Sequence, residues 1–290
     1  MWFWLALCSA VFGALDVILT KKALYKVSSS VLAWAVFTLS IPFFIFLVFL
    51  NGIPSLNLAF FTAVVSSSVV YIFSKIIFNN TLQQNLISKM LPLTAFGGVF
   101  TYIFGLIFLS ESIRLVPLVG LFTIVFGAYI LNADQAKEDL LRPFKLIFLK
   151  RESLLFLLGI MLSSITAILD KWGLKNTAPE SPVFITLVEQ IIMSIMLWGY
   201  LLKKESKSWV GQLKNNFSIL FLNSTVFAIS GTLIFYAYIG APVALVLGVQ
   251  RMRLFFILLM GYLFFKDKPT KHIWIATAIM ILGVLLIKIG

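Results

Sequence analysis

The sequence contains one cysteine, Cys8, and one histidine, His272, in 290 residues. A single cysteine excludes an intrachain disulfide and leaves no thiol pair for a metal site. A single histidine excludes the two-histidine helix patterns of metalloenzymes, and it has no recognisable partner that would activate a serine nucleophile. We therefore expect no enzyme, no metal and no cofactor.

Charged residues are scarce as well. Asp, Glu, Lys and Arg make up 12% of the chain, whereas soluble domains carry roughly 25%. Hydrophobic residues account for 61%, and the mean hydropathy is +1.04. There is too little polar surface to cover a soluble globule, and the long apolar runs match the roughly 20 residues that a helix needs to cross a bilayer. The composition predicts an all-α, multi-pass protein of the plasma or inner cell membrane.

The formal net charge of +12 does not indicate a nucleic-acid partner. Such a partner requires basic residues gathered on a solvated face, whereas here they lie mostly between apolar runs. We expect these residues to orient the chain in the lipid bilayer and to contact anionic headgroups.

Hydropathy predicts ten membrane-spanning helices, near residues 2–20, 31–50, 58–78, 85–109, 115–132, 153–174, 183–202, 217–238, 242–265 and 271–289. The longest polar connection, residues 134–152, divides the chain into two units of five helices, residues 1–133 and 153–290.

The two units share a sequence pattern. Four residues of the first helix recur in the sixth at one constant offset: Ser9, Leu15, Asp16 and Lys21 match Ser163, Leu169, Asp170 and Lys175. Near the end of each unit, Phe100, Gly105, Phe108, Glu111 and Gly127 recur as Phe256, Gly261, Phe264, Asp267 and Gly283. Because five is an odd number, the second unit must enter the membrane from the opposite side. We predict two inverted five-helix repeats, an architecture common among secondary transporters.

Motifs spread over nearly the whole chain are similar to those of one transporter family. They are Asp16 with Lys21, Asp170 with Lys175, Leu91-Pro92, Leu109-Ser110-Glu111, and the glycines Gly120 and Gly127. On these residues the sequence resembles the drug/metabolite transporter superfamily, specifically its EamA-like ten-helix members. It departs from the family pattern at Ser110 and Gly248, where glycine and proline are expected, and at Lys266-Asp267 in place of Gly-Glu. The resemblance implies a basket-like bundle with a central cavity that moves small metabolites, amino acids or drugs.

Ionisable residues within membrane spans are costly, and they usually face the interior of a helix bundle. We predict a substrate site between the two repeats, formed by polar residues of several spans: Asp16, Tyr71, Lys75, Asp170, Glu189, Gln250 and Arg251. In this hypothesis Arg251 holds a carboxylate or phosphate, and Glu189 balances it or accepts a proton. In a regular helix Arg251 and Arg253 point about 200° apart and cannot both face one cavity. Asp16 and Asp170 also fit a structural role, in which each satisfies a neighbouring helix.

The favoured function is secondary transport of a small metabolite that is amino acid-like, zwitterionic or anionic, by alternating access and with protons as a candidate coupling ion. A flippase or scramblase for lipid-linked substrates and a multidrug exporter stay open as alternatives. The protein is expected to act as a monomer or homodimer. Loop charges predict that both termini lie outside, whereas EamA-like proteins usually have both inside.

Overall fold

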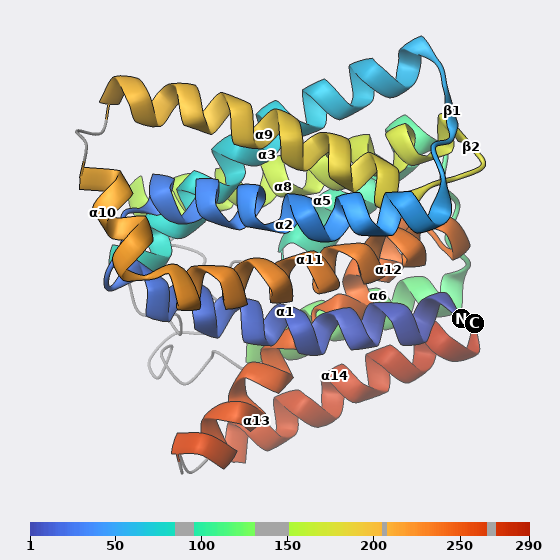
Figure 1. The fold of residues 1–290 in the computed structure, drawn as a ribbon. Helices are drawn as coiled ribbons and strands as arrows, with labels where there is room; N and C mark the ends of the chain where they lie inside the picture. Colours follow the sequence, from blue (N-terminus) through green and yellow to red (C-terminus); the bar gives the residue numbers. More distant parts are fainter. Residues whose placement is uncertain (85–95, 131–150, 205–207, 266–270) are drawn as a thin grey trace.

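A computed structural model shows the fold (Figure 1) and describes residues 1–84, 96–130, 151–204, 208–265 and 271–290. The chain is almost entirely helical there, as predicted. The helices are α1 (Trp2–Leu24), α2 (Ser29–Asn51), α3 (Leu58–Gln84), α5 (Phe96–Leu109), α6 (Leu115–Ile130), α8 (Arg151–Lys175), α9 (Pro182–Lys204), α10 (Ser208–Asn215), α11 (Phe217–Gly240), α12 (Val243–Gln250), α13 (Arg253–Phe265) and α14 (Lys271–Ile289). The strands are β1 (Ser55–Leu56) and β2 (Thr177–Ala178).

Six of these helices are long and apolar enough to cross a membrane, namely α1, α2, α3, α8, α9 and α11. The helices α5, α6 and α14 contain shorter apolar stretches. Large apolar side chains such as Phe46, Phe49 and Ile195 are exposed on the outside of the bundle, where lipid is the solvent that suits them. The prediction of a helical membrane protein is therefore confirmed, and the count of ten spans stays a prediction.

The predicted helix 242–265 is not continuous, because the structure divides it into α12 and α13 at Arg251 and Met252. In this turn the Met252 amide donates to the Val249 carbonyl at 3.0 Å, and the Leu254 amide donates to the Arg251 carbonyl at 3.0 Å. Bonds across three residues tighten the backbone relative to an α-helix. Non-helical backbone within a membrane protein is tolerated where it is buried or lines a cavity.

At three other places the observed helices differ from the predicted spans or are only partly described. Of the predicted span 85–109, only α5 lies within the described residues. The predicted connection 134–152 lies outside them except at its end, where α8 already begins at Arg151. The short helix α10 falls in a stretch that the sequence predicted as a connection, because its 8 residues are too few and too polar for a span.

Helices distant in sequence form the closest packing pairs. The helix α1 packs along α11, α3 along α8, α6 along α14, and α2 along both α9 and α11 (Figure 1). Between α1 and α11, the Ser9 hydroxyl donates to the Ser230 carbonyl at 2.9 Å, and the Ser230 hydroxyl donates to the Ser9 carbonyl at 3.1 Å. Small hydroxyl residues allow this approach and satisfy one another across the interface.

The helices α6 and α14 touch through their backbones. A Cβ added at Gly120 would lie 2.6 Å from the Gly283 carbonyl oxygen, and one added at Gly283 would lie 2.7 Å from the Gly120 oxygen. Real Cβ atoms do not approach oxygen so closely, so this crossing requires glycine on both helices.

The two strands form a short ladder that the sequence did not predict. The strand β1 follows α2 and pairs antiparallel with β2, which follows α8, so that Ser55 lies opposite Ala178 and Leu56 opposite Thr177. Beside the ladder, the side-chain amide of Asn57 donates a hydrogen bond to Asn176 Oδ1 at 2.8 Å. The ladder joins a loop of the first half to a loop of the second, at the end of the bundle where both termini lie (Figure 1).

Candidate functional site

A cavity of about 240 Å³ lies between the helices of the two halves. Its walls come from α1, α2 and α3 of the first half, and from α8, α9, α11 and the α12–α13 break of the second. All seven residues that the sequence singled out line it: Asp16, Tyr71, Lys75, Asp170, Glu189, Gln250 and Arg251. The structure thus brings the predicted set together in one place.

The lining is balanced in formal charge. Three carboxyl side chains and three cationic side chains reach the cavity, namely Asp16, Asp170 and Glu189, and Lys75, Arg251 and Arg253. Around them stand hydroxyl side chains and the aromatic rings of Tyr71, Phe227 and Tyr238. The cavity can therefore offer hydrogen bonds and charges of both signs to one small molecule.

Asp16 is held by a neighbouring helix. The Asn223 amide of α11 donates to Asp16 Oδ1 at 2.9 Å and is 3.3 Å from the Asp16 carbonyl oxygen. One turn earlier on α1, a Cβ added at Gly13 would lie 3.8 Å from Gln250 Nε2 and 3.7 Å from Arg253 Cδ. Asp16 therefore fits both roles considered for it: it lines the cavity, as a substrate-site residue would, and it accepts a hydrogen bond from Asn223 of α11, as a structural residue would.

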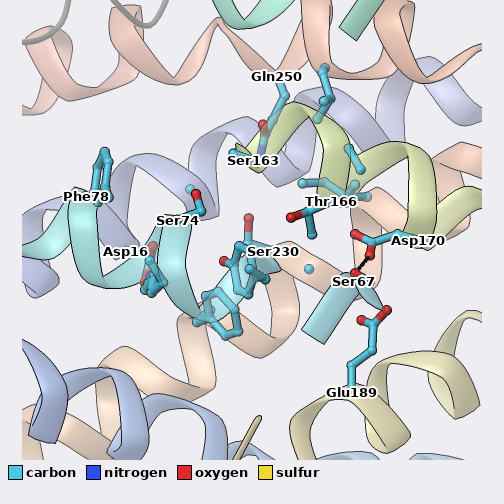
Figure 2. Close-up of a pocket in the computed structure, with 18 of the residues that line it drawn as sticks. Asp16, Ser67, Ser74, Phe78, Ser163, Thr166, Asp170, Glu189, Ser230 and Gln250 are labelled. Carbon is cyan, nitrogen blue, oxygen red and sulfur yellow. Dashed lines mark hydrogen bonds between the residues drawn. The ribbon is translucent and has the colours of Figure 1, made fainter. Parts of the chain in front are cut away.

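Asp170 on α8 and Glu189 on α9 approach the same point from two sides. Asp170 Oδ1 accepts a hydrogen bond from the Ser67 hydroxyl of α3, and Figure 2 shows the Glu189 carboxyl pointing toward this pair.

Lys75 of α3 also lines the cavity, and its ammonium group lies 4.9 Å from the centroid of the Phe227 ring of α11. A cation over a ring face is stabilised by the ring quadrupole.

Arg251 and Arg253 both line the cavity, so the prediction that they cannot share it was wrong. It assumed a regular helix, and the turn between α12 and α13 rotates the two side chains into one space. Arg251 is buried, its Nε has no hydrogen-bond partner within the described residues, and its guanidinium lies where a Cβ at Gly97 would overlap it. Within the described chain, Arg251 and Glu189 form no ion pair, so the proposed balance between them is not a direct contact.

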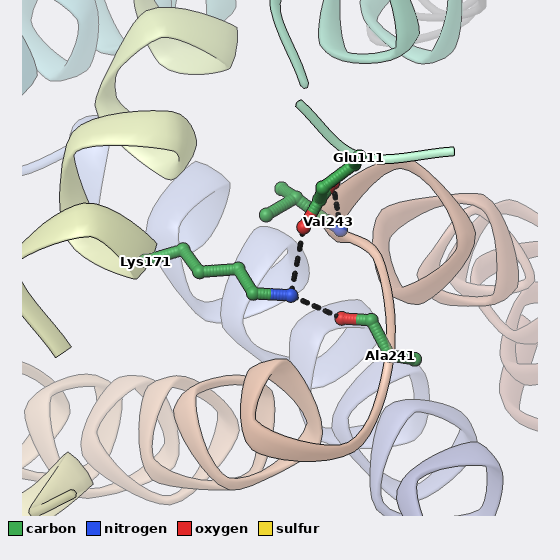
Figure 3. Close-up of polar contacts among 4 residues, drawn as sticks. All are labelled: Glu111, Lys171, Ala241 and Val243. Atoms are coloured by element: carbon green, nitrogen blue, oxygen red, sulfur yellow. Dashed lines mark hydrogen bonds and ion pairs between the residues drawn. The ribbon is translucent and has the colours of Figure 1, made fainter. Parts of the chain in front are cut away.

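A second polar cluster lies beside Asp170, and the sequence missed it. Lys171 Nζ lies 2.7 Å from Glu111 Oε1 and donates to the Ala241 carbonyl at 2.6 Å, while the Val243 amide donates to Glu111 Oε2 at 2.9 Å (Figure 3). Both charged side chains are less than 10% exposed. The predicted span 153–174 already contained Lys171, and α8 continues to Lys175, but nothing in the sequence pointed to Glu111 as its partner.

Other lining residues were overlooked because they are hydroxyl or amide side chains in apolar runs. Ser67, Ser164 and Gln190 all face the cavity. On α3, Ser68, Tyr71 and Lys75 are spaced three and four residues apart, so they share one face of the helix, and all three line the cavity. Asn79, one turn further on, is instead buried against α2, where its amide donates to the Ser29 carbonyl at 3.4 Å. Ser67 lies four residues before Tyr71 on the same face, and this spacing was the signal that could have found it.

A charged cavity between the two halves of a helical membrane protein is the arrangement expected of a membrane transport protein. Comparison with known families agrees with this: residues 150–289 match the EamA-like transporter family, which supports membership of the chain in the drug/metabolite transporter superfamily. The resemblance stated from the sequence is thereby confirmed, and the chain is a membrane transporter of this type.

The same fold occurs in a solved crystal structure of a protein that is 12% identical in sequence. The superposition has a TM-score of 0.72 and covers 99% of this chain and 95% of the other. At this identity the likeness shows the fold alone. No curated protein matches the sequence.

Proposed function

We propose that the protein is a secondary transporter that moves a small zwitterionic or anionic metabolite across the plasma or inner cell membrane by alternating access, coupled to protons. The observation that carries the proposal is the charge-balanced cavity between helices of both halves. The sequence contains no phosphate-binding loop of the Gly-Lys-Ser/Thr type, so an ion or substrate gradient is the proposed source of energy.

Packing supports a ten-span architecture of two inverted repeats. In the sequence repeat, α1 corresponds to α8 and α3 to α11, so the α3–α8 and α1–α11 pairs are one contact made twice. At the α6–α14 crossing, Gly120 faces Gly283, and a Cβ at Gly127 would lie 3.0 Å from the Ala276 carbonyl oxygen. The repeat equates Gly127 with Gly283 and Gly120 with Ala276, so these two contacts are related by a pseudo-two-fold axis.

The mixture of charges favours a metabolite over a lipophilic drug. A multidrug exporter for cations is expected to present a carboxylate among aromatic rings, whereas this cavity holds as many cationic as anionic side chains. Arg251 is the proposed anchor for a carboxylate or phosphate, because guanidinium binds such groups through two parallel hydrogen bonds and its buried Nε has a free donor among the described residues. A lipid-linked substrate would instead need a groove open to lipid.

Replacing Arg251 with lysine tests this anchor. Lysine keeps the charge but lacks the planar fork. A charge-assisted hydrogen bond contributes about 1.5–3 kcal/mol, so we expect the apparent KM to rise about tenfold or more. Substrates would first be sought by thermal shift of the reconstituted protein with amino acids, sugar phosphates, nucleosides and quaternary ammonium compounds, and then measured by uptake.

Arg114→Lys is the matched control, since Arg114 is exposed and outside the cavity. A stably inserted Arg251→Lys variant that transports with unchanged apparent affinity would show that Arg251 is not the anchor. Binding of quaternary ammonium compounds alone would refute the proposed substrate class.

Orientation is proposed from the loop charges, with both termini outside. In a Cys8→Ser background, we expect a membrane-impermeant maleimide to label Asn51→Cys in intact cells and Lys203→Cys only after permeabilisation. Both residues are exposed, at the ends of α2 and α9 respectively. Labelling of position 203, but not position 51, in intact cells would reverse the orientation.

A further inference from the structure

Two carboxyl side chains in the cavity wall share a single hydrogen-bond donor. Asp170 and Glu189 are 9% and 5% exposed, and both are directed toward Ser67 (Figure 2). The Ser67 hydroxyl donates to Asp170 Oδ1, and the Ser67 and Asp170 side chains also lie within hydrogen-bonding reach of the Glu189 carboxyl group. Since a hydroxyl has one proton to donate, Ser67 cannot donate to Glu189 at the same time.

Glu189 is left with an unsatisfied oxygen. Its Oε1 is buried and has no hydrogen-bond partner among the described residues. A buried carboxylate oxygen without a donor loses its hydration with nothing in return. The Asp170 carboxyl group lies at the same point of the cavity wall and places a second negative charge beside Glu189 when both are ionised.

The surrounding residues do not supply the missing positive charge through a direct contact. Lys171, the next residue after Asp170, is bound to Glu111. The cavity cations, Lys75 of α3 and the two arginines of the α12–α13 break, form no ion pair with Asp170 or Glu189 within the described chain. The helix α2 contains no Asp, Glu, Lys, Arg or His. The remaining titratable groups that face the pair are Asp16, Tyr71 and Tyr238.

We propose that Asp170 and Glu189 form the coupling-ion site of the transporter and hold one proton between them. The proton bonds to one carboxyl oxygen and is donated to the other carboxylate, which removes one negative charge and gives Glu189 Oε1 its missing partner. When the cavity opens to water, the O–H bond breaks and the proton leaves to solvent. This inference rests on the proposed function, and it assigns coupling to α8 and α9 and substrate anchoring to Arg251.

Infrared spectroscopy of the protein in phosphatidylcholine vesicles, without any substrate, tests the site directly. On titration from acid to alkaline pH, we expect a protonated-carboxyl C=O band equivalent to one group per chain to persist at neutral pH. The band should be lost in Asp170→Asn and in Glu189→Gln, because each amide donates a hydrogen bond without a titratable proton. Ser67→Ala keeps both carboxyl groups and removes only the hydrogen bond to Asp170, so it should retain the band at a shifted frequency. Retention of the band in this variant would show that its loss in the two amide variants comes from the missing carboxyl group and not from a general disturbance of the site.

Glu180→Gln is the matched control, because Glu180 is an exposed carboxylate outside the cavity, and it should keep the full band. Absence of the band at neutral pH in the unmodified protein, or its persistence in either Asp170→Asn or Glu189→Gln, would overturn the shared-proton site. Loss of the band when sodium chloride replaces choline chloride would also overturn it, in favour of a sodium site. Because no substrate is present, these outcomes are independent of whether the metabolite screen succeeds.

Discussion

Replacement of Lys171 with methionine is expected to destabilise the protein by about 3–5 kcal/mol, the usual effect of removing one partner from a buried ion pair. Methionine fills a similar volume but leaves the Glu111 carboxylate buried beside Gly105 with no opposite charge. It also removes the donor to the Ala241 carbonyl. The free energy of unfolding would be measured by titration with sodium dodecyl sulfate in mixed micelles.

Two further variants separate the ion pair from general packing. Lys175→Met makes the same change one turn later on α8, where the lysine is exposed, and should leave the free energy of unfolding nearly unchanged. The double variant Lys171→Met/Glu111→Gln should recover most of the loss, because a neutral amide still accepts from the Val243 amide. A Lys171→Met variant as stable as the unmodified protein would contradict the buried pair.

The next largest effect is expected at the α6–α14 crossing. Alanine at Gly283 places a methyl group 2.7 Å from the Gly120 carbonyl oxygen, which is backbone and cannot rotate away. The helices must separate, and overpacking of this kind costs typically 1–3 kcal/mol. Gly120→Ala should behave alike, and the double variant should cost less than the sum, because one separation relieves both clashes. The same detergent titration measures these changes.

Gly199→Ala in α9 is the matched control, since a Cβ there meets no atom within 4 Å. Alanine has the higher helix propensity, so this variant should be as stable as the unmodified protein or slightly more so. An equal loss at positions 199 and 283 would mean that the crossing does not depend on glycine.

The sequence was sufficient for the helices and for much of the cavity, because lipid imposes simple requirements. A span must be long and apolar, and a charge within it must face inward, so Asp16, Lys75 and Glu189 could be assigned to a common interior from their positions alone. That inference needed no knowledge of which helices touch.

The features that were missed depend on contacts between distant segments. The turn residues Arg251 and Met252 include no proline or glycine, and Gly248 three positions earlier does not by itself mark a helix end, so hydropathy predicted 242–265 as one continuous helix. The burial of Lys171 depends on Glu111, 60 positions earlier and on a different helix end. Such pairings follow from how the helices are arranged, which hydropathy does not encode.

Because of the β1–β2 ladder, the two halves of the bundle are connected differently at its two ends. At the end with the ladder, the backbone of Ser55–Leu56 pairs with that of Thr177–Ala178 across the two halves, and a movement that separates the two loops has to break this pairing. At the opposite end, the described contact between the α1–α2 turn and the second half includes one hydrogen bond from the Ser28 amide to the Gln212 side chain, at 2.8 Å. The Gln212 side chain can rotate and keep its hydrogen bond when the helices shift, whereas paired strands keep their bonds only if both backbones move together. The β1–β2 ladder therefore ties the two halves together through their backbones at the end of the bundle where the termini lie.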